Sequence, residues 1–568
     1  ILLLRKLVMT MPMVNQFATV PTVDITRNVF VRSHTWKGTI DGGYLYPVFF
    51  DEVIPGDTKR LNSTFFGRLA TPFVPVLDNI YLDYHLFFVP NRLVWEHWQN
   101  FMGERKSPDD SIDYTVPSIT ADSTTGFTPL GFLDYLSVPP SVPSLTANSL
   151  TLYARAYNLI WNEWYRDENL QNSVTVPTGD GPDSESDFPL LKRGKRQDYF
   201  TSSLPAPQKG PGSTLSLAQN SAPVVGNGLG LGIVGHNMTA DTAGYITGGS
   251  GQYAYLIGPS GTSGFATPKG INDSLSGGNL FNQGVGYGYP LGVSQDPKLS
   301  GLVADFSSTG LSFTINSLRQ AIALQQFLEQ DMRGGTRYIE LILSHFGVQS
   351  PDYRLQRPEY LGGGSSRINI SPIAQTSSTD STTPQGNLAA IGTVGSTGNG
   401  FTHSFTEHGV ILGLVSVRCD LTYQQGIDRH FLRKTRYDYF WPTLAHLGEQ
   451  TVYNKEIYAQ GDSQLDSDGN IIDDKAFGYN ERYAEYRYKN SYITSEFRSS
   501  YAQSLDVWHL AQKFNNLPTL NSTFISENPP LSRISAVPSE PALLLDVYHD
   551  LEDIRPIPLY GTPGLRRV

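Results

Sequence analysis

The chain has 568 residues, of which 39% are hydrophobic, 12% aromatic and 17% charged, and its formal net charge is −11 at pH 7. This length allows a large buried core and roughly two to four domains, while the acidic balance argues against a polycationic nucleic-acid binder. The single cysteine, Cys419, excludes an intrachain disulfide framework and a cysteine-rich metal site. Low charge with many aromatic residues is typical of extensive contact surface between proteins, although a large β-rich protein would show the same composition.

The N-terminal apolar segment, residues 1–9, is too short to span a bilayer. Its basic residues, Arg5 and Lys6, lie on the wrong side of the apolar run for a signal peptide. We therefore expect a soluble protein that is made in a reducing compartment and is not exported.

The part of the chain that follows predicts β-structure, with turn residues between the strands. Four strands are predicted: 28–32, 44–53, 61–69 and 80–89. In the fourth strand, alternate residues from Ile80 to Phe88 are apolar, and a period of two places them on one face of a sheet. We expect that face to lie in a core.

The middle of the chain predicts helices, four in number: 92–102, 149–170, 316–333 and 337–345. The second carries an aromatic stripe from Tyr153 to Trp164, which indicates a buried face. In the fourth, Ile339, Ile342 and Phe346 are expected to be buried.

Two segments are rich in Gly, Ser and Thr, residues 205–310 and 362–400. A segment of this composition loses much conformational entropy on ordering and has few side chains to bury. Both segments are therefore predicted to be loops. The C-terminal part then predicts a long strand at 405–423, tyrosine-rich hairpins within 436–500 and a final strand at 542–548.

Cys419 shares one face of the long strand with Ile411, Val415 and Val417, so it is predicted to be buried and unreactive. Separate small sheets at the two ends of the chain would leave long open edges. We therefore predict a mainly β fold, in which strands from 28–90 and 405–550 share one sandwich or barrel. The insertions between them are a helical and loop region, the Gly/Ser-rich tract and a second helical and loop region: 91–204, 205–310 and 311–404.

The motifs that could indicate a dinucleotide, calcium or zinc site are incomplete in this sequence. Residues 230–235 match G-x-G-x-x-G, but a dinucleotide fold needs a strand before it and a helix after it, and here the flanks are more glycine and alanine. A calcium loop starting at Asp466 would need Gly and Glu where the chain has Ile471 and Phe477, so a hairpin turn at 468–469 is expected instead. The histidines are scattered and form no zinc motif. We expect no metal and no cofactor.

The densest basic cluster lies at residues 192–196 and is followed by Tyr199 and Phe200. Basic residues beside aromatic rings can hold single-stranded nucleic acid through phosphate contacts and base stacking. In an acidic protein the same residues can instead form ion pairs within or between subunits. Both interpretations stay open at this point.

Five segments of the chain resemble, in the same order, the major capsid proteins of gokushoviruses, single-stranded DNA bacteriophages of the microvirus family. These segments are residues 28–57, 192–210 (KRGKRQDYFTSSLPAPQKG), 357–363 (RPEYLGG), 508–530 and 560–565 (YGTPGL). They are long, idiosyncratic and spread over nearly the whole chain, so the resemblance is specific.

The resemblance implies a single domain over residues 1–568, an eight-stranded antiparallel jelly roll with large loop insertions that contain helices. It implies a non-enzymatic structural protein, sixty copies of which would form a T=1 icosahedral shell around circular single-stranded DNA. The expected location is the virion, assembled in the bacterial host cytoplasm, with minor pilot or DNA-binding virion proteins as further partners. The family also has a variable insertion that forms a protrusion at the threefold axes, and residues 205–310 would match it and contact a host cell-surface receptor.

Two sets of candidate residues follow. The candidates for DNA contact are Arg5, Lys6, Lys192, Arg193, Lys195 and Arg196. The candidates for contact at the trimer tip or with the host surface are Leu229, Leu231, Ile233, Tyr253, Tyr255 and Tyr287.

The sequence leaves two alternatives from other classes of protein. A trimeric spike protein that binds a receptor or a carbohydrate would also carry long insertions. A β-sandwich glycosidase would need paired carboxylates across a cleft, but Glu163 and Asp167 share one predicted helix. No catalytic residue is therefore proposed.

Overall fold

The computed structural model describes residues 25–213, 315–376 and 388–560, together with residue 379, residues 385–386 and four short strands between residues 224 and 304. The chain divides into two compact units. The first comprises residues 1–209 and 329–568, and the second comprises residues 210–328. The strands of the second unit form two antiparallel pairs: β8 (Val224–Gly226) with β11 (Leu302–Ala304), and β9 (Ile233–Gly235) with β10 (Leu291–Val293).

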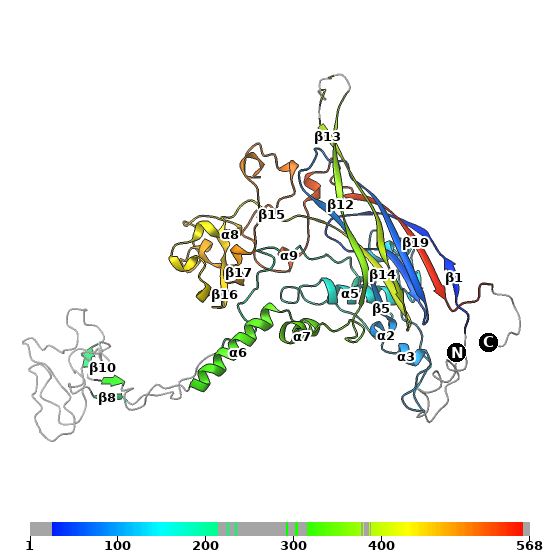
Figure 1. Cartoon of the computed structure of the whole chain (residues 1–568), viewed down its shortest axis with the longest axis horizontal. Coiled ribbons are helices and arrows are strands. Elements are labelled where there is room, and N and C mark those ends of the chain that lie inside the picture. Colours follow the sequence, from blue (N-terminus) through cyan, green and yellow to red (C-terminus); the bar gives the residue numbers. More distant parts are fainter. Residues whose placement is uncertain are drawn as a thin grey trace, which may run out of the picture. The chain divides into compact units, whose positions relative to one another are not determined.

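The first unit is built on one curled antiparallel sheet, which contains nine strands of the described residues (Figure 1). The strands are β1 (Asn28–Val31), β2 (His34–Ile40), β3 (Tyr46–Val53), β4 (Thr58–Leu69), β5 (Ile80–Pro90), β12 (Glu359–Ala374), β13 (Leu388–Ser404), β14 (Gly409–Cys419) and β19 (Leu543–Arg555). Their order in the sheet is β1-β19-β4-β13-β12-β5-β14-β3, and β2 also pairs with β19. The predicted mainly β fold, with strands from both ends of the chain in one structure, is confirmed.

The curl of the sheet encloses the main hydrophobic core. The alternate residues of β5 from Ile80 to Phe88 all lie in this core, as predicted from their period of two. Cys419 is buried in the same core, as are the three residues that share its face of β14. The other face of β5, including Phe87 and Val89, belongs to a second core. Both faces of this strand are therefore covered.

The sheet order is consistent with a jelly roll. β1 and β2 pair with consecutive parts of β19, so together they occupy the place of one strand. β12 passes from pairing with β5 to pairing with β13, and this joins the two halves of the curled sheet. Helices are a minor part of the fold.

The strands β12 and β13 differ from the expectation for residues 362–400, which was a loop. These two strands are the longest of the sheet, and glycine serves their packing. A Cβ atom at Gly363 would lie 2.1 Å from the Tyr84 carbonyl oxygen, and one at Gly400 would lie 1.8 Å from the Leu61 carbonyl oxygen. The glycines that favoured a loop therefore permit close approach between neighbouring strands.

A buried ion cluster, here called the Lys59 cluster, fastens one end of the sheet. The Lys59 ammonium is fully buried and lies 2.5 Å from Asp51 Oδ2, 3.1 Å from Asp553 Oδ1 and 3.6 Å from Asp57 Oδ2. The remaining ion pairs of the cluster join Arg32 to Asp51 and Asp553, and Arg555 to Asp57 and Asp553. Three cations thus face three carboxylates contributed by β3, β4, β19 and their flanking residues.

Helices of the insertion cover the second core. They include α2 (Asn91–Val94), α3 (Trp98–Phe101), α4 (Phe132–Tyr135) and α5 (Leu150–Ile160), which continues into the π-helical turn η2 (Trp161–Tyr165). The two short helices α2 and α3 replace the single predicted helix at 92–102. The aromatic stripe predicted from Tyr153 to Trp164 packs in this core, so the buried face of α5 is confirmed.

The helices α6 (Ile315–Arg333) and α7 (Tyr338–Phe346) lie where the sequence predicts them. The prediction that Phe346 is buried is wrong, because its side chain is 79% exposed. Leu343 on the same helix is also exposed. The apolar pattern of α7 is therefore only partly covered within a single chain.

Residues 420–542 form a further insertion, which shares a small core with Tyr199 and Phe200. Its short elements are β15 (Thr422–Tyr423), β16 (Glu449–Tyr453), α8 (Asn454–Ile457), β17 (Ala476–Glu481), β18 (Ser491–Tyr492) and α9 (Ser522–Ile525). β16 and β17 form an antiparallel pair, which confirms a hairpin within 436–500. The predicted turn at 468–469 is also confirmed, since Leu465 pairs with Ile471 and the Gly469 amide donates to the Asp466 carbonyl at 3.1 Å.

Candidate nucleic-acid interface

The basic segment at residues 192–196 is held between two distant parts of the chain. The Arg193 amide donates to the Gly43 carbonyl at 2.8 Å, and the Glu527 amide donates to the Arg193 carbonyl at 2.7 Å. The Lys195 amide donates to the Ile525 carbonyl at 2.8 Å. These bonds fix the backbone of the segment, so its side chains have defined positions.

Arg193 and Arg418 share one carboxylate, that of Asp83. Arg193 Nη1 lies 2.8 Å and Arg418 Nη2 lies 2.6 Å from the same oxygen, Asp83 Oδ2. Burial raises the pKa of the Asp83 carboxyl, but the charge of Arg418 and a hydrogen bond from Ser365 lower it more, so its pKa lies below the ordinary value. Asp83 is therefore ionised at neutral pH, and one negative charge serves two guanidinium groups.

The other three basic residues of the segment have weaker or more exposed partners. Lys192 Nζ donates to the Asn528 side chain at 3.0 Å and lies 5.0 Å from the centre of the Tyr44 ring. Arg196 forms an ion pair of 3.3 Å with Asp420 and stacks on Tyr81. The intrachain ion pairs that were one of the two interpretations are thus present for Arg193 and Arg196.

Lys195 has no ion pair with a carboxylate of the described residues. Its Nζ is 3.4 Å from Gln512 Oε1 and 4.5 Å from the centre of the Phe524 ring. Burial lowers the pKa of the Lys195 ammonium below its ordinary value, and the charge of Glu527 offsets only part of this effect. This ammonium is therefore a partly buried cation that is incompletely neutralised.

Glu527 lies near the same cations but binds none of them. Its side chain is fully buried, and neither carboxylate oxygen has a hydrogen-bond partner among the described residues. Burial raises the pKa of Glu527 to about 7, against the lowering effect of Lys195 and Arg418. Around neutral pH this carboxyl group is therefore protonated in a large fraction of molecules.

An open cavity of about 360 Å³ lies beside this cluster. Its lining residues come from β5, η2, the basic segment, β12 and β14: His85, Phe87, Trp164, Tyr165, Arg193, Gly194, Lys195, Tyr360 and Arg418. Here it is called the β5–β14 cavity. It brings two of the predicted DNA-contact residues, Arg193 and Lys195, together with Arg418 and a set of aromatic rings.

Most of the remaining predicted residues lie outside the described part of the chain. Arg5 and Lys6 lie outside the described residues, as do Leu229, Leu231, Tyr253, Tyr255 and Tyr287. The backbone of Ile233 belongs to β9 in the second compact unit. The tip-contact residues therefore stay a prediction.

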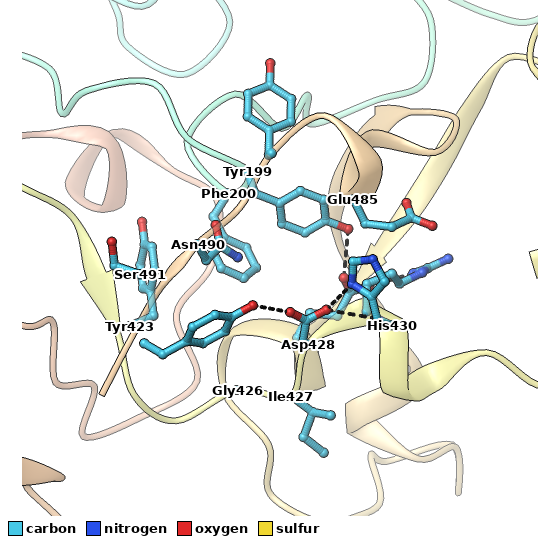
Figure 2. Close-up of a pocket in the computed structure, with 14 residues that line it drawn as sticks. Tyr199, Phe200, Tyr423, Gly426, Ile427, Asp428, His430, Glu485, Asn490 and Ser491 are labelled. Carbon is cyan, nitrogen blue, oxygen red and sulfur yellow. Dashed lines mark hydrogen bonds and ion pairs between the residues drawn. The ribbon is translucent and has the colours of Figure 1, made fainter. Parts of the chain in front are cut away.

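A second, smaller pocket lies between residues 199–200 and the 420–542 insertion, and Figure 2 shows Asp428 and His430 directed toward each other within it. Its volume is about 50 Å³, which accommodates only a few water molecules. Burial raises the pKa of Asp428, but hydrogen bonds from Tyr492 and His430 lower it to about 2. Because its polar groups bind one another, this pocket serves to hold the chain in place.

The described residues contain no cluster of three or more His, Cys, Asp or Glu side chains arranged to hold a metal ion. Within the same part of the chain, no helix combines the length and the apolar character needed to cross a bilayer.

Three charged residues at the site were not singled out from the sequence: Asp83, Arg418 and Glu527. A signal was available for two of them. Asp83 and Arg418 are charged residues inside strands that are otherwise apolar, and such residues are buried only when they are paired. Glu527 lies in an irregular segment and gives no comparable signal.

A curled antiparallel sheet with large insertions, in a jelly-roll order, is an architecture of viral coat proteins. Comparison with known proteins agrees with this class. Residues 18–565 match the family model described as capsid protein (F protein), and the chain belongs to this family.

Curated relatives carry the same description. The chain is 44% identical to capsid protein VP1 of Chlamydia phage 1 over 599 residues, covering 98% of each chain. It is 44% identical to capsid protein VP1 of Bdellovibrio phage phiMH2K over 555 residues (97% of each) and 35% identical to that of Spiroplasma virus 4 over 553 residues (93% of each). The resemblance to gokushovirus capsid proteins is thereby confirmed, and it implies a structural role in a virion.

Proposed function

We propose that this protein is the non-catalytic shell subunit of a small single-stranded DNA phage. Sixty copies assemble in the host cytoplasm into a T=1 icosahedral shell around a circular genome. The insertion at 205–310 forms a protrusion that contacts a host cell-surface receptor. Minor pilot or DNA-binding proteins complete the particle.

The observation that carries the shell role is a large exposed aromatic surface on the 420–542 insertion, here called the aromatic surface. It comprises Phe431, Tyr437, Tyr439, Phe440, Trp441 and Tyr486. Phe431 is 82% exposed, and the other side chains are about half exposed. Arg433 stacks on Tyr439 and Tyr486, and Phe440 contacts Tyr486, so these three rings and the cation lie together.

Such a patch is unusual for a monomer, because aromatic and Arg side chains concentrate at the centres of protein interfaces. A shell subunit covers it with neighbouring copies. A stable contact buries about 1,600 Å² in total, and residues of this kind dominate its energy.

The test is assembly of a Tyr439→Ser/Trp441→Ala variant, followed by electron microscopy and analytical ultracentrifugation. We expect folded subunits, checked by circular dichroism, that form no shells. The single variant Trp441→Phe keeps an aromatic ring at this position and should form shells. Normal shells from the double variant would remove this surface from the subunit contacts, and wild-type particles that stop at trimers would support the spike alternative.

The DNA role is proposed for the basic segment, because its cations lie beside aromatic rings. Arg193 and Arg196 are poor targets for mutation, since their loss would leave Asp83 and Asp420 without a partner. Lys192→Gln with Lys195→Gln removes two cations that form no ion pair with carboxylates of the described residues. We expect shells in normal yield with reduced DNA content, measured by the ratio of absorbance at 260 and 280 nm. Normal DNA content would exclude these lysines.

The host-contact role is tested by deleting residues 215–300. We expect shells that adsorb poorly to host cells, measured by depletion of particles from the medium. Unchanged infectivity would exclude this role.

A further inference from the structure

The β5–β14 cavity has the features of a binding site as well as of a packing defect, and three observations decide between the two. The first is its size. Ligand pockets are roughly 300–1,000 Å³, and this cavity is about 360 Å³, which suits a group of the size of one nucleotide.

The second observation is a local excess of positive charge. Arg193, Lys195 and Arg418 line the cavity, and Asp83 is the carboxylate that pairs with the two arginines. Glu527 binds no cation directly. An anion in the cavity would accept charge-assisted hydrogen bonds from these groups in a partly dehydrated setting, where such bonds are strong.

The third observation is the aromatic wall, the set of rings that line the cavity together with the cations. The Tyr360 ring centre lies 5.8 Å from that of Trp164 and 5.6 Å from that of Phe87. His85 stacks on Tyr165 with an interplanar angle of 14°, and its Nδ1 is 2.9 Å from the Tyr165 hydroxyl. Arg357 lies over the Trp164 ring at 4.4 Å and Arg193 over the Tyr165 ring at 5.6 Å, so each of these rings already faces one cation. Tyr360, whose side chain is 43% exposed, is the most accessible of the rings on which a planar heterocycle can stack.

A small inorganic anion would leave the aromatic wall unused, and a neutral sugar would leave the cations unneutralised. A nucleotide would contact the aromatic rings with its base and neutralise the cations with its phosphate. None of the described side chains that line the cavity is an amide or a carboxylate, so the edge of a base would meet few groups able to distinguish it.

We propose that the β5–β14 cavity binds one nucleotide of single-stranded DNA, with its phosphate at Arg193, Lys195 and Arg418 and its base against Trp164 and Tyr360. Binding depends on the stacked ring and the charge, and not on base identity. The inference rests on the proposed DNA-enclosing function and assigns a specific site to it.

The first test is calorimetric titration of the purified full-length protein with thymidine 5′-monophosphate, thymidine and inorganic phosphate. We expect the monophosphate to bind at least about tenfold more tightly than either fragment, because stacking and charge both contribute. An oligothymidylate should compete for the site, and an abasic strand of equal length should compete poorly. Phosphate binding as tightly as the nucleotide would overturn the proposal.

Two variants locate the binding. Lys195→Gln removes a cation and Tyr360→Leu removes a ring while keeping apolar bulk. Each should weaken nucleotide binding about tenfold. Lys37→Gln, an exposed lysine that pairs with Asp546, is the matched control and should bind as the wild type does. Unchanged binding in both cavity variants would overturn the proposal.

A second measurement needs no variant. Ultraviolet cross-linking of native particles whose DNA carries 5-bromodeoxyuridine, followed by mass spectrometry, should yield nucleotide adducts on peptides that contain Trp164 or Tyr360. Adducts that avoid both peptides would overturn the proposal. Particles with shells and normal DNA but without these adducts would leave the proposed capsid function standing, whereas a failure of the wild-type protein to form shells would remove that function itself.

Discussion

Two ion clusters lie against the same sheet, and they differ in how completely their charged groups are paired. In the Lys59 cluster three cations meet three carboxylates, and each charged group has an ion-pair partner. Beside the β5–β14 cavity Arg193, Lys195, Arg196 and Arg418 lie near four carboxyl groups, of which only Asp83 and Asp420 form ion pairs with them; the other two are Asp198 and Glu527. Glu527 binds none of them, and Lys195 has no ion pair within the described residues.

The difference separates a structural role from a binding role. A fully paired cluster around a buried Lys59 stabilises the register of strands, because removing one member exposes the others to the penalty of unpaired burial. A cluster with unpaired members that opens on a cavity gains little for folding and leaves positive charge available to a ligand. Mutations in the two clusters should therefore have different effects.

The largest effect is expected from Lys59→Met. The change leaves three buried carboxylates with two guanidinium groups, so the free energy of unfolding should fall by about 3–5 kcal/mol. Urea unfolding of unassembled subunits, followed by circular dichroism, measures it. Lys37→Met, at an exposed ion pair, should change the free energy by less than about 1 kcal/mol. Equal effects of the two substitutions would contradict the structural role of the Lys59 cluster.

A smaller effect with a defined pH dependence is expected from Glu527→Gln. The folded subunit holds the Glu527 proton more tightly than the unfolded chain, since burial raises the pKa from 4.5 to about 7. Wild-type stability should therefore fall as the pH rises from about 4.5 through about 7, by at most about 3 kcal/mol. Glutamine stays neutral and should abolish this fall. Unfolding curves at pH 5, 6, 7 and 8 test it, with the exposed Glu540→Gln as control; a variant that follows the wild-type profile would show that Glu527 is ionised at low cost.

The smallest effect is expected from Lys195→Met. The substitution removes one long hydrogen bond and a contact with the Phe524 ring. The free energy of unfolding at pH 6 should therefore change by about 1 kcal/mol or less. Chemical unfolding beside Lys59→Met makes the comparison direct. A loss as large as that of Lys59→Met would mean that the two clusters have the same role.

Much of the fold could be predicted from side-chain periodicity. The alternation in β5 and the stripe on α5 arise from burial of one face, which leaves a clear mark in the sequence. The sequences of β12 and β13 show no such pattern. Their glycines are there because neighbouring backbones approach closely, as at Gly363 beside Tyr84, and that requirement depends on the partner strand.

The site could be predicted only in part. The basic segment is visible because its charges are adjacent in the sequence. The charge balance of the segment is not visible in the sequence, because Asp83 and Glu527 are contributed by parts of the chain far from Arg193. The same cations could have been solvated, paired or turned toward a cavity, and folding decides which.

The pairing of Phe88 with Glu359 has a practical consequence. The chain leaves the sheet at the end of β5, at Pro90, and returns to it at the start of the adjacent strand β12, at Glu359. Both ends of the connection 91–358 therefore lie at the same end of two hydrogen-bonded strands. Lengthening a connection of this kind adds only about 0.6 kcal/mol of closure entropy for each doubling. Foreign peptides grafted at an exposed part of this connection, such as residues 102–109, would leave the hydrogen-bond register of the sheet intact, which makes it a suitable point for building display particles.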